Sequence, residues 1–184
     1  MIYRRIYNFI PADTLEQMHQ ELMSGSQWTW RTNFWRYYLL DGLHPYNEAN
    51  EATWYGNQMS VLTRSLSGHW KKLFSQVFEL AGPNFLLQRY ALTGQTQGQE
   101  QELHGDTSDA LSGDFRSYLI YLNTRWDDDW GGVTEFAKNN QITHIEYPEP
   151  GKLIEFDSQA QHRGQGPNKS GLLRLSLVLH GKIV

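Results

Sequence analysis

The feature that most constrains the fold is the series of short strand-like segments that follows Gly82-Pro83. From there to the C-terminus, apolar, β-branched and aromatic stretches alternate with turn signals, a pattern typical of an all-β barrel or sandwich. Eight strands are predicted, at Phe85–Leu92, Glu100–His104, Arg116–Leu122, Gly132–Phe136, Ile142–Glu146, Lys152–Phe156, Ala160–Gly164 and Leu172–His180.

The part of the chain before Pro83 is predicted to be mainly helical. Between Pro11 and Gly25, apolar residues recur at the spacing of one helix face. A longer helical pattern runs from about Thr53 to Leu80, with Gly68 as a candidate break and Gly82-Pro83 as its end. The residues of these two faces are Leu15, Met18, His19 and Leu22, and Val61, Leu62, Leu66, Trp70, Leu73, Phe74, Val77 and Phe78.

These elements predict a mainly β fold with N-terminal helices. Trp28–Leu40 is dominated by aromatic residues that alternate as on a pleated strand, and we expect this stretch at a sheet edge. Eight strands after two helices favour a jelly roll, or double-stranded β-helix of the cupin type, with the helices packed on the major sheet. The 184 residues have the size of one domain, with helical support over about 1–82 and the jelly-roll core over about 83–184.

Charge and cysteine usage exclude several classes of function. The formal net charge is -4, so nothing indicates a surface for nucleic acid or for an anionic membrane. The chain has no apolar run of membrane-spanning length and no signal-peptide core, and we expect a cytoplasmic protein. It also lacks cysteine, so a metal would depend on histidine and carboxylate ligands. The partner we expect is a substrate that is a small molecule, a peptide or a protein, and the oligomeric state is not indicated.

A histidine and aspartate motif carries the chemistry. His104 and Asp106 lie where a predicted strand enters a loop, and His162 lies on the seventh predicted strand. Two imidazoles and one carboxylate can bind a ferrous ion on one face and leave three positions for a chelating co-substrate and dioxygen. The spacing alone also fits a simpler interpretation, in which these residues are a strand cap, a turn residue and a surface histidine.

The last predicted strand adds a second constraint. Alternation along Leu173–Leu179 sends the leucines to one face and Arg174, Ser176 and Val178 to the other, inside the barrel. A buried arginine needs an anion, and the sequence around Arg174 offers no obvious acidic partner. A dicarboxylate such as 2-oxoglutarate fits, since it would chelate iron at one end and meet Arg174 and Ser176 at the other. The alternative is an Arg174 that pairs with a distant carboxylate or reaches solvent.

Five blocks of sequence, in a fixed order, are more specific than the triad: Leu87-Gln88-Arg89-Tyr90, His104-Gly105-Asp106, the 20 residues from Ser117 to Phe136, the stretch from Gly151 to Gly166, and that from Arg174 to Gly181. On these blocks the chain resembles the iron(II)/2-oxoglutarate-dependent dioxygenase superfamily, and within it the prolyl-4-hydroxylase-like branch. The resemblance extends from about Phe85 to the C-terminus.

The resemblance implies a hydroxylase that uses Fe(II), 2-oxoglutarate and O2, with ascorbate as a further candidate. Such an enzyme oxidises an unactivated C–H bond and releases succinate and CO2, and the metal centre carries the chemistry without a separate acid or base. The resemblance also implies that Tyr121 donates a hydrogen bond to the distal carboxylate of 2-oxoglutarate, and that Tyr90 lines the same pocket. Asp106 favours hydroxylation, because related halogenases replace this carboxylate with a small residue.

The substrate is less constrained. Collagen-type prolyl hydroxylases use a lysine where this chain has Arg174, so peptidyl proline is the leading substrate by resemblance, and a free amino acid or small metabolite is the alternative. The residues are also compatible with a cupin-type metal enzyme that does not use 2-oxoglutarate and with a binding module without turnover. Gln95–Gln101 is predicted to be either a lid or a plain solvent loop. The acidic run Asp127–Asp129 is predicted to be a solvated loop rather than a second metal site.

Overall fold

A computed structural model describes residues 1–24, 28–31, 34–37, 68–107 and 112–184. Its helices are α1 (Ala12–Ser24), α3 (Gly68–Ala81) and the 3-10 turn η2 (Asp128–Trp130). Its strands are β1 (Ile2–Ile6), β2 (Trp28–Arg31), β3 (Phe34–Tyr37), β4 (Phe85–Gln95), β5 (Asp114–Tyr121), β6 (Thr134–Lys138), β7 (Gln141–Glu146), β8 (Leu153–Asp157), β9 (Gln161–Gly164) and β10 (Arg174–Ile183).

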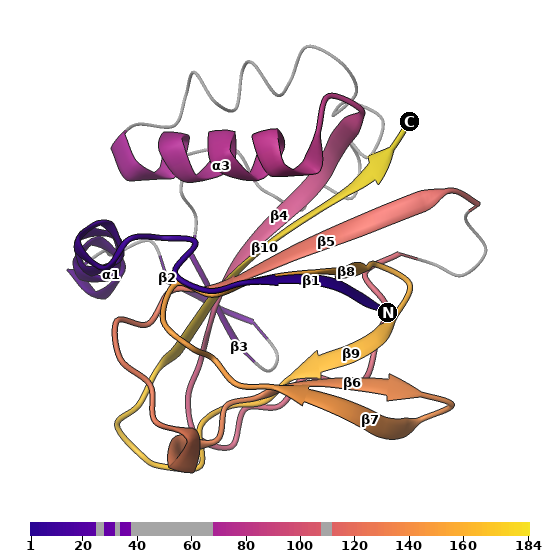
Figure 1. Cartoon of the computed structure of the whole chain (residues 1–184). Coiled ribbons are helices and arrows are strands. Elements are labelled where there is room, and N and C mark those ends of the chain that lie inside the picture. The colour runs from indigo at the N-terminus through magenta and orange to yellow at the C-terminus, as the bar shows by residue number, and fades with distance from the viewer. Residues whose placement is uncertain (25–27, 32–33, 38–67, 108–111) are drawn as a thin grey trace.

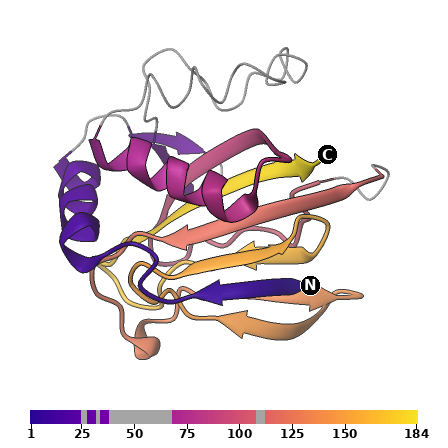
Figure 2. The ribbon, with the colours of Figure 1, turned by 45° about the horizontal axis from the view of Figure 1, so that its top comes forward.

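The described strands form two antiparallel sheets. The major sheet has seven strands in the order β1-β8-β5-β10-β4-β3-β2, and the minor sheet has three in the order β7-β6-β9. Both helices lie over the outer face of the major sheet, and the minor sheet lies on its other side (Figure 1, Figure 2). This arrangement confirms the predicted mainly β jelly roll with helices packed on the major sheet.

The core has two layers. Between the helices and the major sheet, the apolar faces of α1 and α3 are buried as their periodicity predicts, through Leu15, Met18 and Leu22 and through Trp70, Leu73, Phe74 and Val77. The indole of Trp70 donates a 2.9 Å hydrogen bond to Glu21 and so links the two helices. A smaller cluster between the sheets contains Leu119, Tyr121, Phe136, Ile154 and Phe156. Each large apolar side chain that is fully buried in this way contributes roughly 1.5–3 kcal/mol to the free energy of folding.

Strand β10 separates these two layers. Leu175, Leu177 and Leu179 pack into the helix-side core, which confirms the predicted alternation. Arg174 and Ser176 therefore lie between the sheets, where they are 2% and 3% exposed. The buried cation inside the barrel follows from this alternation.

A β-bulge in strand β4 changes which side chains reach the interior. Along β10, His180 pairs with Arg89 and the next residue, Gly181, pairs with Leu87, so Gln88 is the extra residue on β4. Because one extra residue reverses the alternation, Leu87 and Tyr90 both belong to the helix-side core. A Cβ at Gly181 would lie 2.3 Å from the Leu86 carbonyl oxygen, so the close approach at the bulge requires glycine.

Several predicted elements differ in detail. The predicted strand Glu100–His104 is not continuous, since only Glu100 and His104 form isolated bridges, with Gln165 and His162. The predicted strands Phe85–Leu92 and Leu172–His180 correspond to the longer β4 and to β10, which ends at Ile183. The other predicted strands are present with their ends shifted by a few residues.

The N-terminal half also differs from its predicted helical character. Strand β1 lies in a segment without a predicted strand, because a bulge between Ile2 and Arg4 interrupts its alternation. The described part of the second helix starts at Gly68, which has a φ of 52°, and Thr53–Ser67 lies outside the described residues. The aromatic segment forms the hairpin β2–β3 at the edge of the major sheet, as expected, and residues 32–33 and 38–40 are outside the described part.

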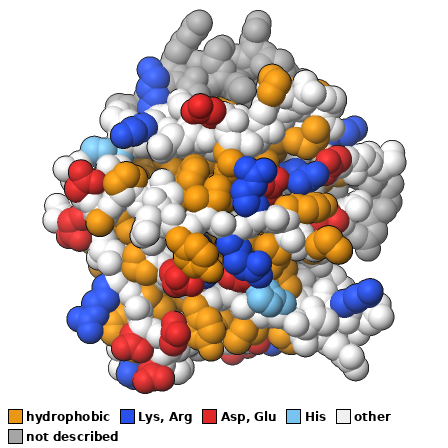
Figure 3. Space-filling view, in the orientation of Figure 1, with side chains coloured by type: hydrophobic (Ala, Val, Ile, Leu, Met, Phe, Trp, Pro, Cys, Tyr) orange, Lys and Arg blue, Asp and Glu red, His pale blue; other side chains and the backbone are white. Residues whose placement is uncertain are grey.

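The surface carries charges of both signs. On the face in Figure 3, basic side chains stand next to acidic and hydrophobic ones rather than forming a continuous basic surface. Within the described ranges, no helix is long and apolar enough to cross a membrane.

Candidate metal centre and adjacent pocket

The fold brings His104, Asp106 and His162 together. His104 is held against β9 by two backbone hydrogen bonds with His162, of 3.0 and 2.8 Å. One nitrogen from each imidazole and one oxygen of Asp106 all lie within 4.8 Å of one another. Among the residues that the structure describes, this is the one group of three or more such side chains that could hold a metal ion.

Both imidazoles are oriented for metal binding. The Nδ1 atom of His104 lies 2.8 Å from the Glu102 carbonyl oxygen, and that of His162 lies 2.9 Å from the Ala160 carbonyl oxygen. Because a carbonyl oxygen only accepts, each Nδ1 carries the proton and each Nε2 keeps a lone pair. Two free nitrogen donors beside a carboxylate fit the donor set of a ferrous ion in an open site.

The Asp106 carboxylate is fixed from two sides. Arg89 donates a 2.7 Å hydrogen bond to Oδ1, and Ser117 donates a 2.6 Å bond to Oδ2, which lies 3.7 Å from Nε2 of His162. Burial by itself would raise the pKa of Asp106, but His162, Arg89, His180 and the Ser117 bond outweigh it and lower the pKa to about 2. The carboxylate is therefore ionised at neutral pH.

Sequence reasoning did not identify Arg89 or Ser117 as site residues. A partial signal exists for Ser117, since alternation along β5 places it on the same face as Tyr121. Arg89 reaches Asp106 through the bulge at Gln88, which no sequence pattern indicates.

A buried histidine, His180, is linked to Ser117 through the hydroxyl of Ser158. His180 is 3% exposed, and its two nitrogens lie 2.9 Å from the hydroxyls of Ser158 and Thr107. The hydroxyl of Ser158 is in turn 2.9 Å from that of Ser117. Burial, partly opposed by Asp106, lowers the pKa of His180 to about 4. His180 is therefore neutral in the folded protein at pH values where a free histidine is charged.

This shift predicts an acid-dependent loss of stability. The unfolded chain takes up a proton at His180 below pH 6.5, whereas the folded protein does so only near pH 4. The contribution of neutral His180 to the free energy of unfolding is therefore present above pH 6.5 and is lost as pH falls toward 4. We expect it to amount to about 2 kcal/mol between about pH 7.5 and about pH 5. Urea denaturation at the two pH values should show that His180→Gln loses less stability on acidification than the wild type. Equal losses would refute this assignment.

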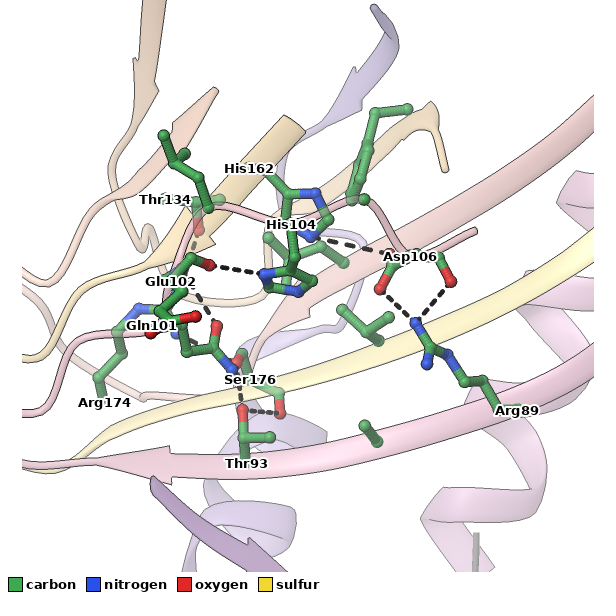
Figure 4. A pocket seen from close by; sticks show the side chains of 17 residues that line it. Arg89, Thr93, Gln101, Glu102, His104, Asp106, Thr134, His162, Arg174 and Ser176 are labelled. Atoms are coloured by element: carbon green, nitrogen blue, oxygen red, sulfur yellow. Dashed lines mark hydrogen bonds and ion pairs between the residues drawn. The ribbon is translucent and has the colours of Figure 1, made fainter. Parts of the chain in front are cut away.

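A pocket of about 420 Å³ extends from the triad into the barrel. Arg89 and Asp106 lie at one end of it and Arg174 lies at the other, with the two imidazoles between them (Figure 4). Its apolar wall is formed by Leu119, Phe156 and Val178.

Arg174 is a buried cation whose hydrogen-bond partners within the described ranges are all neutral. It donates hydrogen bonds to the Gly132 carbonyl oxygen (2.6 Å), the Thr134 hydroxyl (2.7 Å), the Gln95 amide oxygen (2.8 Å) and the Ser176 hydroxyl (3.2 Å). No ion pair between described residues involves Arg174. Burial lowers its pKa from the usual value. A cation left without a counter-charge beside an open pocket fits a carboxylate ligand.

The other predicted pocket residues take different positions. Ser176 lines the pocket, with its hydroxyl 2.9 Å from that of Thr93. Tyr121 lies behind the pocket wall: its hydroxyl is 2.8 Å from that of Thr134, and its ring centroid is 5.3 Å from the Arg174 guanidinium carbon. Thr134, which the sequence did not single out, faces the pocket in its place.

Tyr90 does not line the pocket, and this corrects the expectation for it. The bulge at Gln88 turns its ring toward α3, where it packs edge-on against Phe74 at 5.3 Å. Its hydroxyl is buried without a hydrogen-bond partner among the described residues, and burial raises its pKa to about 12.

Two further predictions can be compared with the structure. Amide side chains tie the two ends of the segment Gln95–Gln101 to the end of β9, whereas Gln97, Gly98 and Glu100 between them are exposed. The acidic run is exposed, as expected, and Asp127 caps η2 through a 3.0 Å hydrogen bond from the Asp129 amide.

Comparison with known proteins supplies the family. The structure is similar to a prolyl-4-hydroxylase from Pseudomonas putida (TM-score 0.60, 16% identity, covering 98% of this chain and 92% of that one). It is also similar to a prolyl hydroxylase from Trichoplax adhaerens in complex with a hypoxia inducible factor peptide fragment (TM-score 0.61, 15% identity, covering 98% of this chain and 83% of that one). A third similar structure is the viral collagen prolyl hydroxylase of Paramecium Bursaria Chlorella virus-1 in its 2OG complex (TM-score 0.57, 18% identity, covering 100% of this chain and 97% of that one).

At these identities the likeness shows a shared fold. No curated protein matches the chain. The family model described as the 2OG-Fe(II) oxygenase superfamily matches residues 85–180, just over half of the chain, which includes the triad and Arg174. The chain therefore belongs to the 2OG-Fe(II) oxygenase superfamily.

Proposed function

We propose that the protein is a hydroxylase in which His104, Asp106 and His162 hold Fe(II) and Arg174 binds the distal carboxylate of 2-oxoglutarate. The observation that carries this proposal is the buried Arg174, whose hydrogen-bond partners among the described residues are all neutral and which lies across the pocket from the triad. When bound, iron with 2-oxoglutarate and dioxygen supplies the oxidation of a C–H bond, with succinate and CO2 as products.

The protein's own groups orient the reactants. The hydroxyls of Thr134 and Ser176 both contact the Arg174 guanidinium, so they are placed to share the distal carboxylate with it. The carbonyl groups that hold Nδ1 of His104 and His162 keep both rings turned toward the pocket. The apolar wall formed by Leu119, Phe156 and Val178 limits the water around the reacting centre.

For the substrate, we propose a proline residue in a peptide, with a free amino acid or small metabolite as the second candidate. The similar Trichoplax protein was solved with a peptide fragment, which supports a peptide for this chain as well. A cupin-type metal enzyme that does not use 2-oxoglutarate would have no need for a buried cation between Ser176 and Thr134.

The proposal is tested by adding Fe(II) and then 2-oxoglutarate to the protein without oxygen. We expect a visible charge-transfer band that requires both additions, because chelation through the 2-oxo acid group places the ligand on the metal. Absence of the band in metal-loaded protein would contradict the proposal. Succinate release on admission of oxygen, with and without ascorbate, should then be stimulated more by a proline-containing peptide than by free proline.

A further inference from the structure

Gln95 occupies a position that the proposed function does not yet explain. It is the last residue of β4, it is 1% exposed, and its side chain lies between Arg174 on β10 and Gly164 on β9. It therefore bridges the two sheets at the Arg174 end of the pocket, beside the cation proposed to bind 2-oxoglutarate.

The orientation of the Gln95 amide is determined by its partners. The Nε2 group donates to two backbone carbonyl oxygens, those of Gly164 at 3.0 Å and Gln99 at 3.3 Å. A carbonyl oxygen cannot donate, so the opposite end of the amide must be its oxygen, and this oxygen accepts a 2.8 Å hydrogen bond from Nη1 of Arg174. The amide thus holds the guanidinium without adding charge.

The surroundings leave Gln95 little freedom. A Cβ at Gly164 would lie 2.9 Å from the Gln95 amide oxygen and 3.3 Å from Nη1 of Arg174, so these groups are packed directly against the glycine. The carbonyl of Gln99 that holds Gln95 also accepts a 2.7 Å bond from the Gly166 amide. The Gly164 carbonyl accepts a 3.1 Å bond from the Gln101 backbone amide, so both acceptors for the Gln95 amide are fixed by backbone contacts.

We propose that Gln95 is a positioning residue for the co-substrate: it fixes the Arg174 guanidinium while leaving its positive charge uncompensated for the distal carboxylate. This inference rests on the proposed function. It explains why a buried arginine is held by a neutral amide where a carboxylate of similar shape would neutralise it. A glutamate at this position would form an internal ion pair with Arg174 and compete with the ligand.

The test compares two 2-oxo acids in Gln95→Glu. 2-Oxoglutarate carries the distal carboxylate and 2-oxobutanoate does not, although both chelate iron in the same way. In the wild type we expect 2-oxoglutarate to bind about 100-fold more tightly, as measured by anaerobic titration of the charge-transfer band. In Gln95→Glu this preference should fall to about 10-fold or less through loss of 2-oxoglutarate affinity alone.

Matched variants separate charge from structure. Gln97→Glu places the same charge two residues away, on an exposed side chain in the turn that follows β4. It should keep the wild-type preference for 2-oxoglutarate over 2-oxobutanoate. Gln95→Met removes the hydrogen bond without adding charge, and it should weaken 2-oxoglutarate binding by about threefold, which is less than the loss in Gln95→Glu. Fe(II) affinity should be unchanged in all three variants.

Two outcomes would overturn the inference. In the first, both 2-oxo acids lose affinity equally in Gln95→Glu and in Gln95→Met, which would make Gln95 a packing residue. In the second, both variants keep the wild-type preference. If the wild type gives no charge-transfer band with either acid, the proposed function itself fails, and that result is distinct from the other two.

Discussion

Replacement of Arg174 by methionine is expected to abolish measurable 2-oxoglutarate binding while ferrous iron binding stays close to that of the wild type. The change removes the buried positive charge that faces the pocket and keeps most of the side-chain volume. A desolvated pair between a guanidinium and a carboxylate loses about 4 kcal/mol when one partner is removed, which corresponds to roughly 1000-fold in Kd. The substitution removes an uncompensated buried charge, which favours folding, but it also leaves the four groups that Arg174 contacts without their donor. Urea denaturation of the variant therefore accompanies the binding measurement.

Anaerobic titration of the iron-loaded variant with 2-oxoglutarate measures this effect, and a separate titration with Fe(II) measures the affinity of the metal centre. Arg163→Met is the matched control, since Arg163 is on β9 next to His162 but pairs with Glu135 at 2.6 Å. The control should keep its affinity for 2-oxoglutarate within about twofold. Equal loss of iron and 2-oxoglutarate in Arg174→Met would refute its assigned role.

Asp106→Asn is expected to lower iron affinity by at least about 100-fold and turnover by at least about 1000-fold. Asparagine has nearly the same shape, but its amide is neutral and a poor metal ligand. The substitution also removes the charge that Arg89 and Ser117 stabilise in the ionised carboxylate. The fold should persist, so the loss reports on the metal centre.

Iron affinity and iron-dependent succinate release test this prediction. Asp129→Asn provides the control, because Asp129 is exposed on η2 and outside the pocket. It should match the wild type in both measurements. Wild-type iron affinity in Asp106→Asn would exclude Asp106 as a ligand.

Local patterns predicted much of the fold because they report directly on burial. The faces of α1 and α3 follow from helical spacing, and the face of each β10 residue follows from alternation. Strand β1 and the segment Glu100–His104 were harder to predict, since an edge strand with a bulge and a segment held by isolated bridges lack a regular period. Such elements depend on neighbours that are distant in the sequence.

The same limit applies to the candidate site. Tyr90 was assigned to the pocket through the family resemblance, but one extra residue at Gln88 turns it to the opposite face. Tyr121 was assigned to the distal carboxylate through the same resemblance, and Thr134 was not considered. Both lie beside Arg174, and only the three-dimensional packing shows that Thr134 is the one that lines the pocket.

The sequence by itself determined the types of group available and the faces they occupy. It supplied His104, Asp106 and His162 as the metal-binding candidates, and the leucine alternation that places Arg174 inside the barrel. The tertiary structure alone decided which groups support them: Arg89 and Ser117 on Asp106, and Gln95 and Thr134 on Arg174. The physical reason is that period-two alternation specifies the face of a residue, whereas strand order, register and bulges specify its hydrogen-bond partners.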